Sequence, residues 1–276
     1  MFSLYLLAFY AVLLAVKPTR KWALALTPWL IFACSYDCMR LYPNYKVNPI
    51  DVKNLFMAEK HLFGFFHQQG ETLIPSQYFA LHHNTFLDFM AGIFYLCWVP
   101  VPLLFGIYLY IIGEKKTYLN FSIAFLVVNL LGFIGYYLYP AAPPWYALNY
   151  GFEPILHTPG NVAGLGRWDN LTGLNIFQTL YGKNANVFAA VPSLHSAYML
   201  VATIYAIIGK RSVYTITIFS IICVGIWFTA VYTCHHYIID VLLGILTAVL
   251  GIILLQWFVH KTIVGKQFIQ SYIQAI

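Results

Sequence analysis

Long apolar segments separated by short connectors run along most of the chain. A membrane-crossing helix needs about 20 consecutive apolar residues, and it must be helical because backbone groups in lipid find partners only within their own segment. The first two apolar segments are shorter than this length, so the pattern predicts six to seven spans. The predicted spans are Met1–Val16, Trp22–Tyr36, Leu87–Gly113, Thr117–Tyr139, Val191–Ile208, Val213–Cys234 and Tyr237–Val259.

Prolines fall inside two of these predicted spans. Pro28 interrupts the second one, which makes the N-terminal hairpin the least regular part of the pattern. Pro100 and Pro102 should kink the third span, because proline lacks a backbone donor and its ring clashes with the preceding turn. The chain is therefore predicted to be an all-α, polytopic membrane helical bundle that forms one domain.

Two long polar segments lie between the spans, at 37–86 and 140–190. The first contains VKNLFMAEKHLFGFF, whose apolar spacing predicts an amphipathic helix. This helix either lies along the outer membrane interface or packs on the bundle as an ordinary surface helix. The second segment is rich in Pro, Gly and Asn, has no strong period, and is interpreted as a loop. Long loops between spans more often carry function than not.

The composition agrees with a membrane protein, since 61% of the residues are hydrophobic and 9% are charged. Soluble domains carry about 25% charged residues. No basic run indicates a nucleic-acid partner. The five cysteines form no CxxC pair and no metal-like spacing, so we interpret them as small apolar residues and expect no metal or cofactor. No protein partner can be inferred, and the apolar start, lacking a preceding basic region, is not expected to be a cleaved signal peptide.

The placement of charge orients the predicted bundle. Nine of the 15 Lys and Arg residues lie in short connectors and the tail, namely Lys17, Arg20, Lys21, Lys115, Lys116, Lys210, Arg211, Lys261 and Lys266. Short basic loops face the cytoplasm. Nearly all the acidic residues and histidines fall on the opposite, external side. We divide the chain into an N-terminal hairpin with an external interfacial segment (1–86), a catalytic helical core (87–260) with its external loop, and a cytoplasmic tail (261–276).

Asp240 is an ionisable residue near the start of an otherwise apolar helix. A bare carboxylate in that position costs at least ~2.5 kcal/mol, so it should have a partner. His236 lies four positions earlier, on the same helix face. Asp240 can accept the Nδ1 proton of His236, which fixes the tautomer and leaves Nε2 unprotonated. Such a ring is a base or nucleophile held by a third group.

His195 begins the helix that precedes the one ending near His236, and a tight turn joins the two helices. Taken alone, His195 would be an interfacial residue with a satisfied hydrogen bond. As antiparallel neighbours, the two helices bring both imidazoles to the same depth, where one ring is a nucleophile and the other a general acid. This arrangement suits phosphoryl transfer through a phosphohistidine. No acidic cluster is present for two-metal, nucleotide-dependent chemistry, so the expected donor is a lipid phosphodiester or monoester.

The motifs PSLHS and HHYIID, with YPAAPPWY after the fourth span, resemble the type-2 phosphatidic acid phosphatase superfamily. They are most similar to its inositol-phosphorylceramide synthase branch, closely over 130–245. The resemblance implies that His236 is the nucleophile, that Asp240 orients it, and that His195 protonates the departing alcohol. The hydrolytic members carry a Lys/Arg motif before the loop and an Arg where this chain has Ala230. Both departures agree with the synthase branch.

Without those basic motifs, other groups must bind the phosphate. Arg167 is the nearest basic side chain on the external face, with Lys183 and His235 as reserves. Arg167 can bind phosphate with two hydrogen bonds, or it forms a surface pair with Asp169. Ser193 either donates to phosphate or is a simple helix N-cap.

Trp145 and Tyr146 follow the two prolines that end the fourth span. They either wall the head-group site, as the resemblance favours, or belong to the aromatic belt at the membrane interface.

Three functions remain open at this point. The first is a phosphotransferase that moves a phospho-alcohol, with inositol phosphate the first guess, from a glycerophospholipid to a ceramide-like or other lipid hydroxyl. The second is a lipid phosphate phosphatase with the same site. The third is a transporter or scramblase, which predicts polar residues deep in several spans, whereas only Asn120 and Asn129 fit that pattern. As an enzyme, the protein would act on a phospholipid and a lipid alcohol. Its site would lie on the non-cytoplasmic face of the bacterial inner membrane or in a Golgi or ER lumen.

Overall fold

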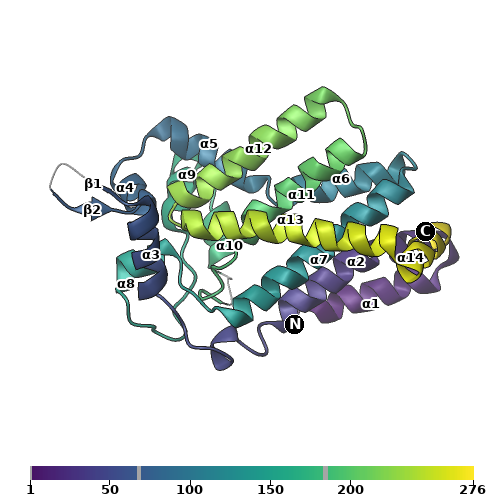
Figure 1. Ribbon diagram of the computed structural model, residues 1–276, viewed down its shortest axis with the longest axis horizontal. Helices are drawn as coiled ribbons and strands as arrows, with labels where there is room; N and C mark the ends of the chain where they lie inside the picture. The colour runs from purple at the N-terminus through teal and green to yellow at the C-terminus, as the bar shows by residue number, and fades with distance from the viewer. Residues whose placement is uncertain (1, 67–69, 183–185) are drawn as a thin grey trace.

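The computed structural model describes residues 2–66, 70–182 and 186–276 (Figure 1). The long helices run side by side along the long axis of the molecule, and most of the short helices gather at one end, on the left in Figure 1. The long and medium helices are α1 (Phe2–Ala15), α2 (Arg20–Cys38), α3 (Lys53–Phe63), α5 (Thr85–Leu96), α6 (Pro100–Ile111), α7 (Lys115–Leu138), α11 (Leu194–Ile208), α12 (Val213–Tyr232), α13 (Ile238–Lys261) and α14 (Ile263–Ala275). The short ones are α4 (Pro75–Leu81), α8 (Pro144–Tyr150), α9 (Gly166–Thr172) and α10 (Ile176–Tyr181).

Helix α7 is the centre of the bundle, because α2, α6, α11 and α13 all pack on it. Its side chains Leu119, Phe121 and Val128 are fully buried in the main apolar core. Outside the helices, the described residues contain one small hairpin, in which β1 (Phe65–Phe66) pairs antiparallel with β2 (Thr72–Leu73). The prediction of an all-α helical bundle is therefore confirmed.

The number of spans is smaller than predicted when helix length and hydropathy are applied to the described residues. Helices α7, α12 and α13 are long and apolar enough to cross a membrane. Helices α5 and α6 pass together as one span bent by 40°, which gives up to four. Helices α1 and α11 are apolar but shorter. Several apolar helices make this an integral membrane protein, but six to seven spans are not confirmed.

Proline acts as predicted in one span and not in the other. The third predicted span breaks after Leu96 and resumes with Pro100 at the first position of α6, where its missing N–H costs nothing. The prediction that Pro28 interrupts the second span is wrong, because α2 runs through it. The carbonyl of Leu24, which the absent Pro28 N–H would have served, instead accepts a hydrogen bond of 2.7 Å from the Tyr272 hydroxyl.

The segments outside the long spans are more ordered than the sequence suggests. Helix α3 buries Leu55, Phe56 and Glu59 against α8 and α13, so it packs on the bundle as the second of the two interpretations states. In its described residues, the predicted loop 140–190 contains the short α-helices α8, α9 and α10. The predicted tail 261–276 forms α14, which packs on α7 and α13. The periodicity did not reveal these helices because they are short or lie beside glycines and prolines.

Close packing of α13 on the start of α11 positions the candidate site. Gly244 allows this approach, since a Cβ there would overlap the carbonyl oxygen of Ser193 and the hydroxyl of Ser196. The Ser193 N–H donates to the Asp240 carbonyl at 3.0 Å, and the Ser196 hydroxyl donates to the Val241 carbonyl at 3.1 Å. The first turns of the two helices are therefore fixed to each other.

Candidate active site

The structure brings the two histidines and the aspartate together at the end of the bundle where the short helices gather. Nδ1 of His195, on the first turn of α11, lies 3.1 Å from Nε2 of His236. Nδ1 of His236, in the turn between α12 and α13, lies 3.3 Å from Oδ2 of Asp240. The three groups form one chain of hydrogen bonds whose middle member is His236.

The turn that holds His236 is fixed by backbone contacts. The carbonyl of Ala230, at the end of α12, accepts from the N–H groups of both His235 (3.0 Å) and His236 (2.9 Å). Cys234 adopts a left-handed conformation with φ of 62°, which turns the chain toward α13. Oδ2 of Asp240 also accepts from the Tyr237 N–H at 2.9 Å, so the carboxylate caps its own helix while it faces His236.

Burial decides the charge state of His236. Its side chain is 7% exposed, and this loss of water lowers its pKa to about 4, below the usual 6.5. The ring is therefore neutral at pH 7. With Nδ1–H donating to Asp240, Nε2 is an acceptor, and the proton in the contact between the histidines belongs to Nδ1 of His195. This tautomer is assigned from the hydrogen-bond partners.

A small polar cavity of ≈ 60 Å³ opens beside both histidines. Its wall combines ring, amide and apolar groups from the segment 143–190 and the His235–His236 turn. The lining residues are Pro143, Trp145, Asn161, Tyr181, Asn186, Val187, Ala189, Ala190, His195, His235 and His236. The described part of this wall contains no Lys or Arg.

His235 lines this cavity, but it is not placed as a cationic phosphate ligand. Its Nδ1 lies 3.2 Å from the carbonyl oxygen of Thr233, so Nδ1 carries the proton and donates. Burial first, and then the neighbouring His236 and His195, hold the pKa of His235 well below its usual range. Its buried Nε2 has no hydrogen-bond partner among the described residues. As a bare acceptor, Nε2 suits a hydroxyl group better than a phosphate oxygen.

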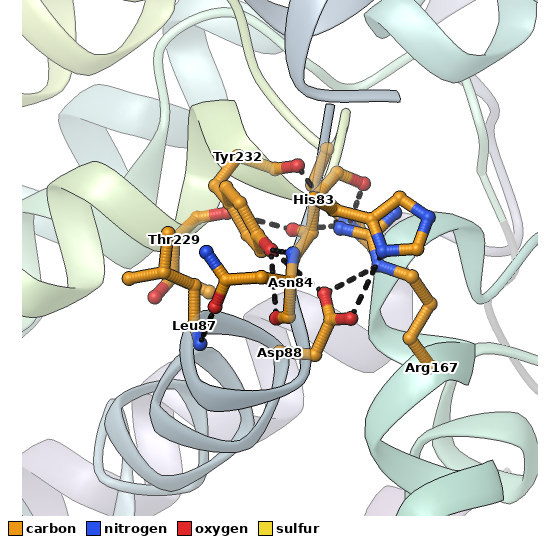
Figure 2. A network of polar contacts seen from close by, with 9 residues as sticks. His83, Asn84, Leu87, Asp88, Arg167, Thr229 and Tyr232 are labelled. Carbon is orange, nitrogen blue, oxygen red and sulfur yellow. Dashed lines mark hydrogen bonds and ion pairs between the residues drawn. The ribbon is translucent and has the colours of Figure 1, made fainter. Parts of the chain in front are cut away.

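Arg167 does not line the cavity, and it forms an ion pair with the buried Asp88 (Figure 2). Its Nε lies 2.6 Å from Oδ1 of Asp88, and its guanidinium stacks over the Tyr232 ring at 5.0 Å. The alternative pairing with Asp169 is wrong, because the Asp169 carboxylate accepts from the N–H groups of Phe177 and Gln178 at the start of α10.

The Arg167–Asp88 pair belongs to a network that ties three helices together behind the site (Figure 2). Oδ1 of Asp88 also accepts from the Tyr232 hydroxyl at 2.8 Å, and Oδ2 lies 3.1 Å from Nδ1 of His83. Asn84 caps α5 through the Leu87 N–H at 2.9 Å. The network thus connects α5, α9 and the end of α12, which is the helix that leads into His235 and His236.

The remaining predicted binding residues divide between the cavity and the interior. Trp145 lines the cavity. Its backbone N–H donates to the Cys234 carbonyl at 3.0 Å, which anchors α8 on the turn that holds His235 and His236. Tyr146 is fully buried and its hydroxyl bonds the backbone of Glu153 and Ile155.

Ser193, another predicted phosphate ligand, does not line the cavity. Ser193 is fully buried and forms no side-chain cap, so its interpretation as a simple N-cap is wrong. Lys183 lies outside the described residues.

Several neighbours of the histidines were not anticipated. Tyr95 stacks on His195 at a centroid distance of 5.1 Å, and Trp98 contacts the same ring at 4.5 Å. Glu59 is fully buried and accepts from the N–H groups of Ile238 and Ile239 at 2.9 and 3.1 Å. The aromatic contacts left no signal in the spacing, but Glu59 did, because it is a carboxylate on the apolar face of an amphipathic helix.

The polar residues of the fourth span have local partners. Asn129 donates to the Phe125 carbonyl at 2.8 Å and its Oδ1 accepts from the Tyr198 hydroxyl at 2.5 Å. Asn120 donates to the Lys116 carbonyl at 2.8 Å. Within residues 2–66, 70–182 and 186–276, no group of three or more His, Cys, Asp or Glu side chains is arranged to hold a metal ion.

A bundle of apolar helices with two histidines and an aspartate in one hydrogen-bonded chain defines an integral membrane protein with a potential nucleophilic site. A family model described as the PAP2 superfamily matches residues 70–254. The chain belongs to this superfamily. The match begins after α3, so α1, α2 and α3 lie outside it.

Curated relatives agree with this assignment. The chain is 59% identical, over its whole length and 89% of the relative, to a phosphoinositol dihydroceramide synthase of Bacteroides thetaiotaomicron. It is 28% identical, over 95% of its length, to the inositol phosphorylceramide synthase catalytic subunit AUR1 of Saccharomyces cerevisiae, and 29% identical, over 80%, to an inositol phosphorylceramide synthase of Candida albicans. It spans 63% and 45% of these two fungal proteins. No solved structure matches the chain.

Proposed function

We propose that this protein is a membrane lipid phosphotransferase that moves inositol phosphate from a glycerophospholipid to the hydroxyl of a ceramide-like lipid. The observation that carries the proposal is the position of His236, whose Nε2 faces His195 while Asp240 holds its Nδ1. The similarity over the whole chain to a protein named phosphoinositol dihydroceramide synthase supports the same activity and makes dihydroceramide the first acceptor to test.

The reaction proceeds in two displacements. Nε2 of His236 attacks phosphorus and the bond from phosphorus to the diacylglycerol oxygen breaks. His195, protonated on both nitrogens when the anionic donor is bound, gives that oxygen a proton and becomes neutral. The acceptor hydroxyl then attacks the phosphohistidine, His195 takes its proton, and the bond from phosphorus to nitrogen breaks. Asp240 stabilises the charge that develops on the His236 ring. The protein requires no cofactor for these steps, and its partners are the two lipids and the membrane.

The catalytic unit comprises 87–260, completed by the N-terminal helices that pack on it. The site faces the non-cytoplasmic side of the membrane. This orientation is supported by the charge pattern, because the basic connectors between α1 and α2, α6 and α7, and α11 and α12 lie at the end of the bundle opposite the short helices (Figure 1). The bacterial relative supports an inner-membrane location.

The proposal is tested with purified protein, phosphatidylinositol labelled in the inositol, and dihydroceramide. Labelled phosphoinositol dihydroceramide should appear only when the acceptor is present, and a His236→Ala variant should produce none. Release of free inositol phosphate at the same rate without the acceptor, or of inorganic phosphate from a lipid monoester, would identify a phosphatase instead. Lipid movement that persists in His236→Ala would support a transporter.

A further inference from the structure

A second and wider cavity of ≈ 700 Å³ meets His195. Its wall is aromatic and aliphatic and is built from α2, the break between α5 and α6, α10 and α11. The main lining residues are Phe32, Tyr36, Trp98, Thr179, Leu180 and Tyr198. We call this cavity the aromatic cleft. Its size and apolar wall suit the acyl-bearing part of a lipid.

The aromatic cleft and the small polar cavity meet at His195 and Tyr181, which line both. His236 and His235 line only the polar cavity. His236, which carries the attacking nitrogen, therefore lines the polar space, whereas the His195 ring, which exchanges a proton with the lipid oxygen, lines both spaces. The two parts of a phospholipid, its polar head group and its lipid alcohol, have matching places on the two sides of His195.

Arg40 lies at the edge of the aromatic cleft. It lines this cleft and also a smaller cavity of ≈ 130 Å³ that reaches His195 and Asn186. Among the described residues that line these spaces and the polar cavity, Arg40 is the one Lys or Arg. Its side chain is 48% exposed, and its Nε is 3.7 Å from Asp37, a loose pairing that leaves donors available.

We propose that the aromatic cleft binds the lipid alcohol in both halves of the reaction, first as the diacylglycerol part of the donor and then as the ceramide-like acceptor, and that Arg40 favours the anionic donor. This inference rests on the proposed function. Both lipids must present their oxygen to the same proton-exchanging ring, His195, so one cleft serves them in turn. The donor carries a negative phosphodiester and the acceptor is neutral, so the Arg40 cation distinguishes them.

The first experiment asks whether the two lipids share the aromatic cleft. Diacylglycerol added to the wild-type protein should inhibit competitively against dihydroceramide. Thr179→Trp, which narrows the cleft, should lower kcat/KM for both lipids about tenfold, the cost of about 1.4 kcal/mol of lost binding. Gln178→Trp is the matched control, because Gln178 neighbours Thr179 on α10 and does not line the cleft.

The second experiment isolates Arg40. Arg40→Ala should raise the KM for phosphatidylinositol about tenfold, as expected for the loss of a charged hydrogen bond, and leave the KM for dihydroceramide unchanged. Arg40→Lys should restore part of the loss. Lys46→Ala removes the same charge from an exposed residue that lines none of these cavities, and it should have no effect.

The outcomes separate this inference from the function on which it rests. If the wild-type protein forms no product from both lipids, the proposed function fails. If it does, but diacylglycerol is noncompetitive and Thr179→Trp matches Gln178→Trp, the shared cleft is wrong. If Arg40→Ala and Lys46→Ala behave alike, the role of Arg40 is wrong. Equal thermal unfolding temperatures of variant and control ensure that folding is not the cause.

Discussion

Nδ1 of His195 and Nε2 of His236 lie 3.1 Å apart, within hydrogen-bonding distance. In the proposed reaction, Nε2 of His236 forms the bond to phosphorus, so the substrate must displace this contact. The proton of His195 then turns from His236 to the lipid oxygen. The hydrogen bond between His195 and His236 therefore orients both rings in the free protein. When the substrate binds, this bond is replaced by contacts of the two rings with the substrate.

The first prediction concerns the acid limb of activity. Because burial lowers the pKa of His236 to about 4 from its usual 6.5, the ring stays unprotonated well below neutrality. We expect the acid limb of kcat/KM that reports His236 to lie below pH 6.5. The folded protein resists protonation of this ring. The neutral ring therefore contributes to the free energy of unfolding above pH 6.5, and this contribution is lost as the pH falls through about 4. A pH–rate profile measures the limb, and an inflection at or above 6.5 assigned to His236 would contradict the prediction.

The second prediction concerns the carboxylate that orients His236. Asp240→Asn keeps the shape of the side chain but loses its charge and one of its two acceptor oxygens, so its NH2 group can face His236 and favour the wrong tautomer. We expect kcat to fall about 10⁴-fold. The phosphohistidine should form slowly, which rapid quenching with labelled phosphatidylinositol measures. Glu71→Asn, a change at an exposed carboxylate, is the control. Full activity in Asp240→Asn would exclude the orienting role.

The third prediction separates Arg167 from the substrate. Arg167→Ala leaves the buried Asp88 without its cation, and we expect a loss of about 3 kcal/mol in the free energy of unfolding. The KM for phosphatidylinositol should not change in the protein that remains folded. Removing Asp88 as well should cost less than the two single changes combined, because no unpaired charge is then left. A selective rise in the donor KM with unchanged stability would make Arg167 a phosphate ligand.

The sequence predicts the centre of the site better than its surroundings, for a physical reason. His236 and Asp240 are four residues apart on one turn of chain, and His195 reaches them through two helices joined by a short turn, so local rules suffice. The partner of Arg167 lies 79 positions earlier in the chain. No spacing rule selects Asp88 over Asp169, because the choice depends on how α5 and α9 pack.

A contact between distant parts of the chain also explains why the sequence does not predict an uninterrupted helix α2. Pro28 reads as an interruption because its own segment cannot satisfy the Leu24 carbonyl. The hydroxyl that does so belongs to Tyr272, 248 positions away in α14. Glu59 is different, since its place on the apolar face of α3 is visible in the sequence and could have indicated a buried partner. That partner is the N-terminus of α13, where helix N–H groups and the helix dipole favour a carboxylate.

The fourth prediction concerns Glu59. Desolvation raises its pKa to about 7 from the usual 4.5, against the opposing effect of its two backbone hydrogen bonds, with Asp240 adding to the rise. The folded protein holds this proton more tightly than the unfolded one, so the contribution to stability is full below pH 4.5 and lost as the pH rises through about 7. Glu59→Gln should remove this pH dependence of the thermal unfolding temperature.

Glu59→Gln should also lower stability at every pH, because an amide offers one acceptor where the two N–H groups of Ile238 and Ile239 each need one. A lost buried acceptor costs about 1–3 kcal/mol. Lower kcat with unchanged KM would indicate that Glu59 positions the helix that carries Asp240. Glu71→Gln is the matched control at an exposed site. Identical pH profiles of unfolding for Glu59→Gln and the wild type would contradict the prediction.

The fifth prediction uses the close packing of α13 on α11 at Gly244. Gly244→Ala places a Cβ against the Ser193 carbonyl, which is backbone and cannot rotate away, so α13 must move from the first turn of α11. We expect a loss of about 1–3 kcal/mol in stability, typical of overpacking, and a fall in kcat larger than the stability loss explains, because His195 and Asp240 separate. Leu243→Ala, at a partly exposed neighbouring position, is the control. The rate of phosphohistidine formation and the thermal unfolding temperature, measured on both variants, separate the effect on catalysis from the effect on stability. Unchanged kcat in a folded Gly244→Ala protein would mean that this contact does not set the distance between the histidines.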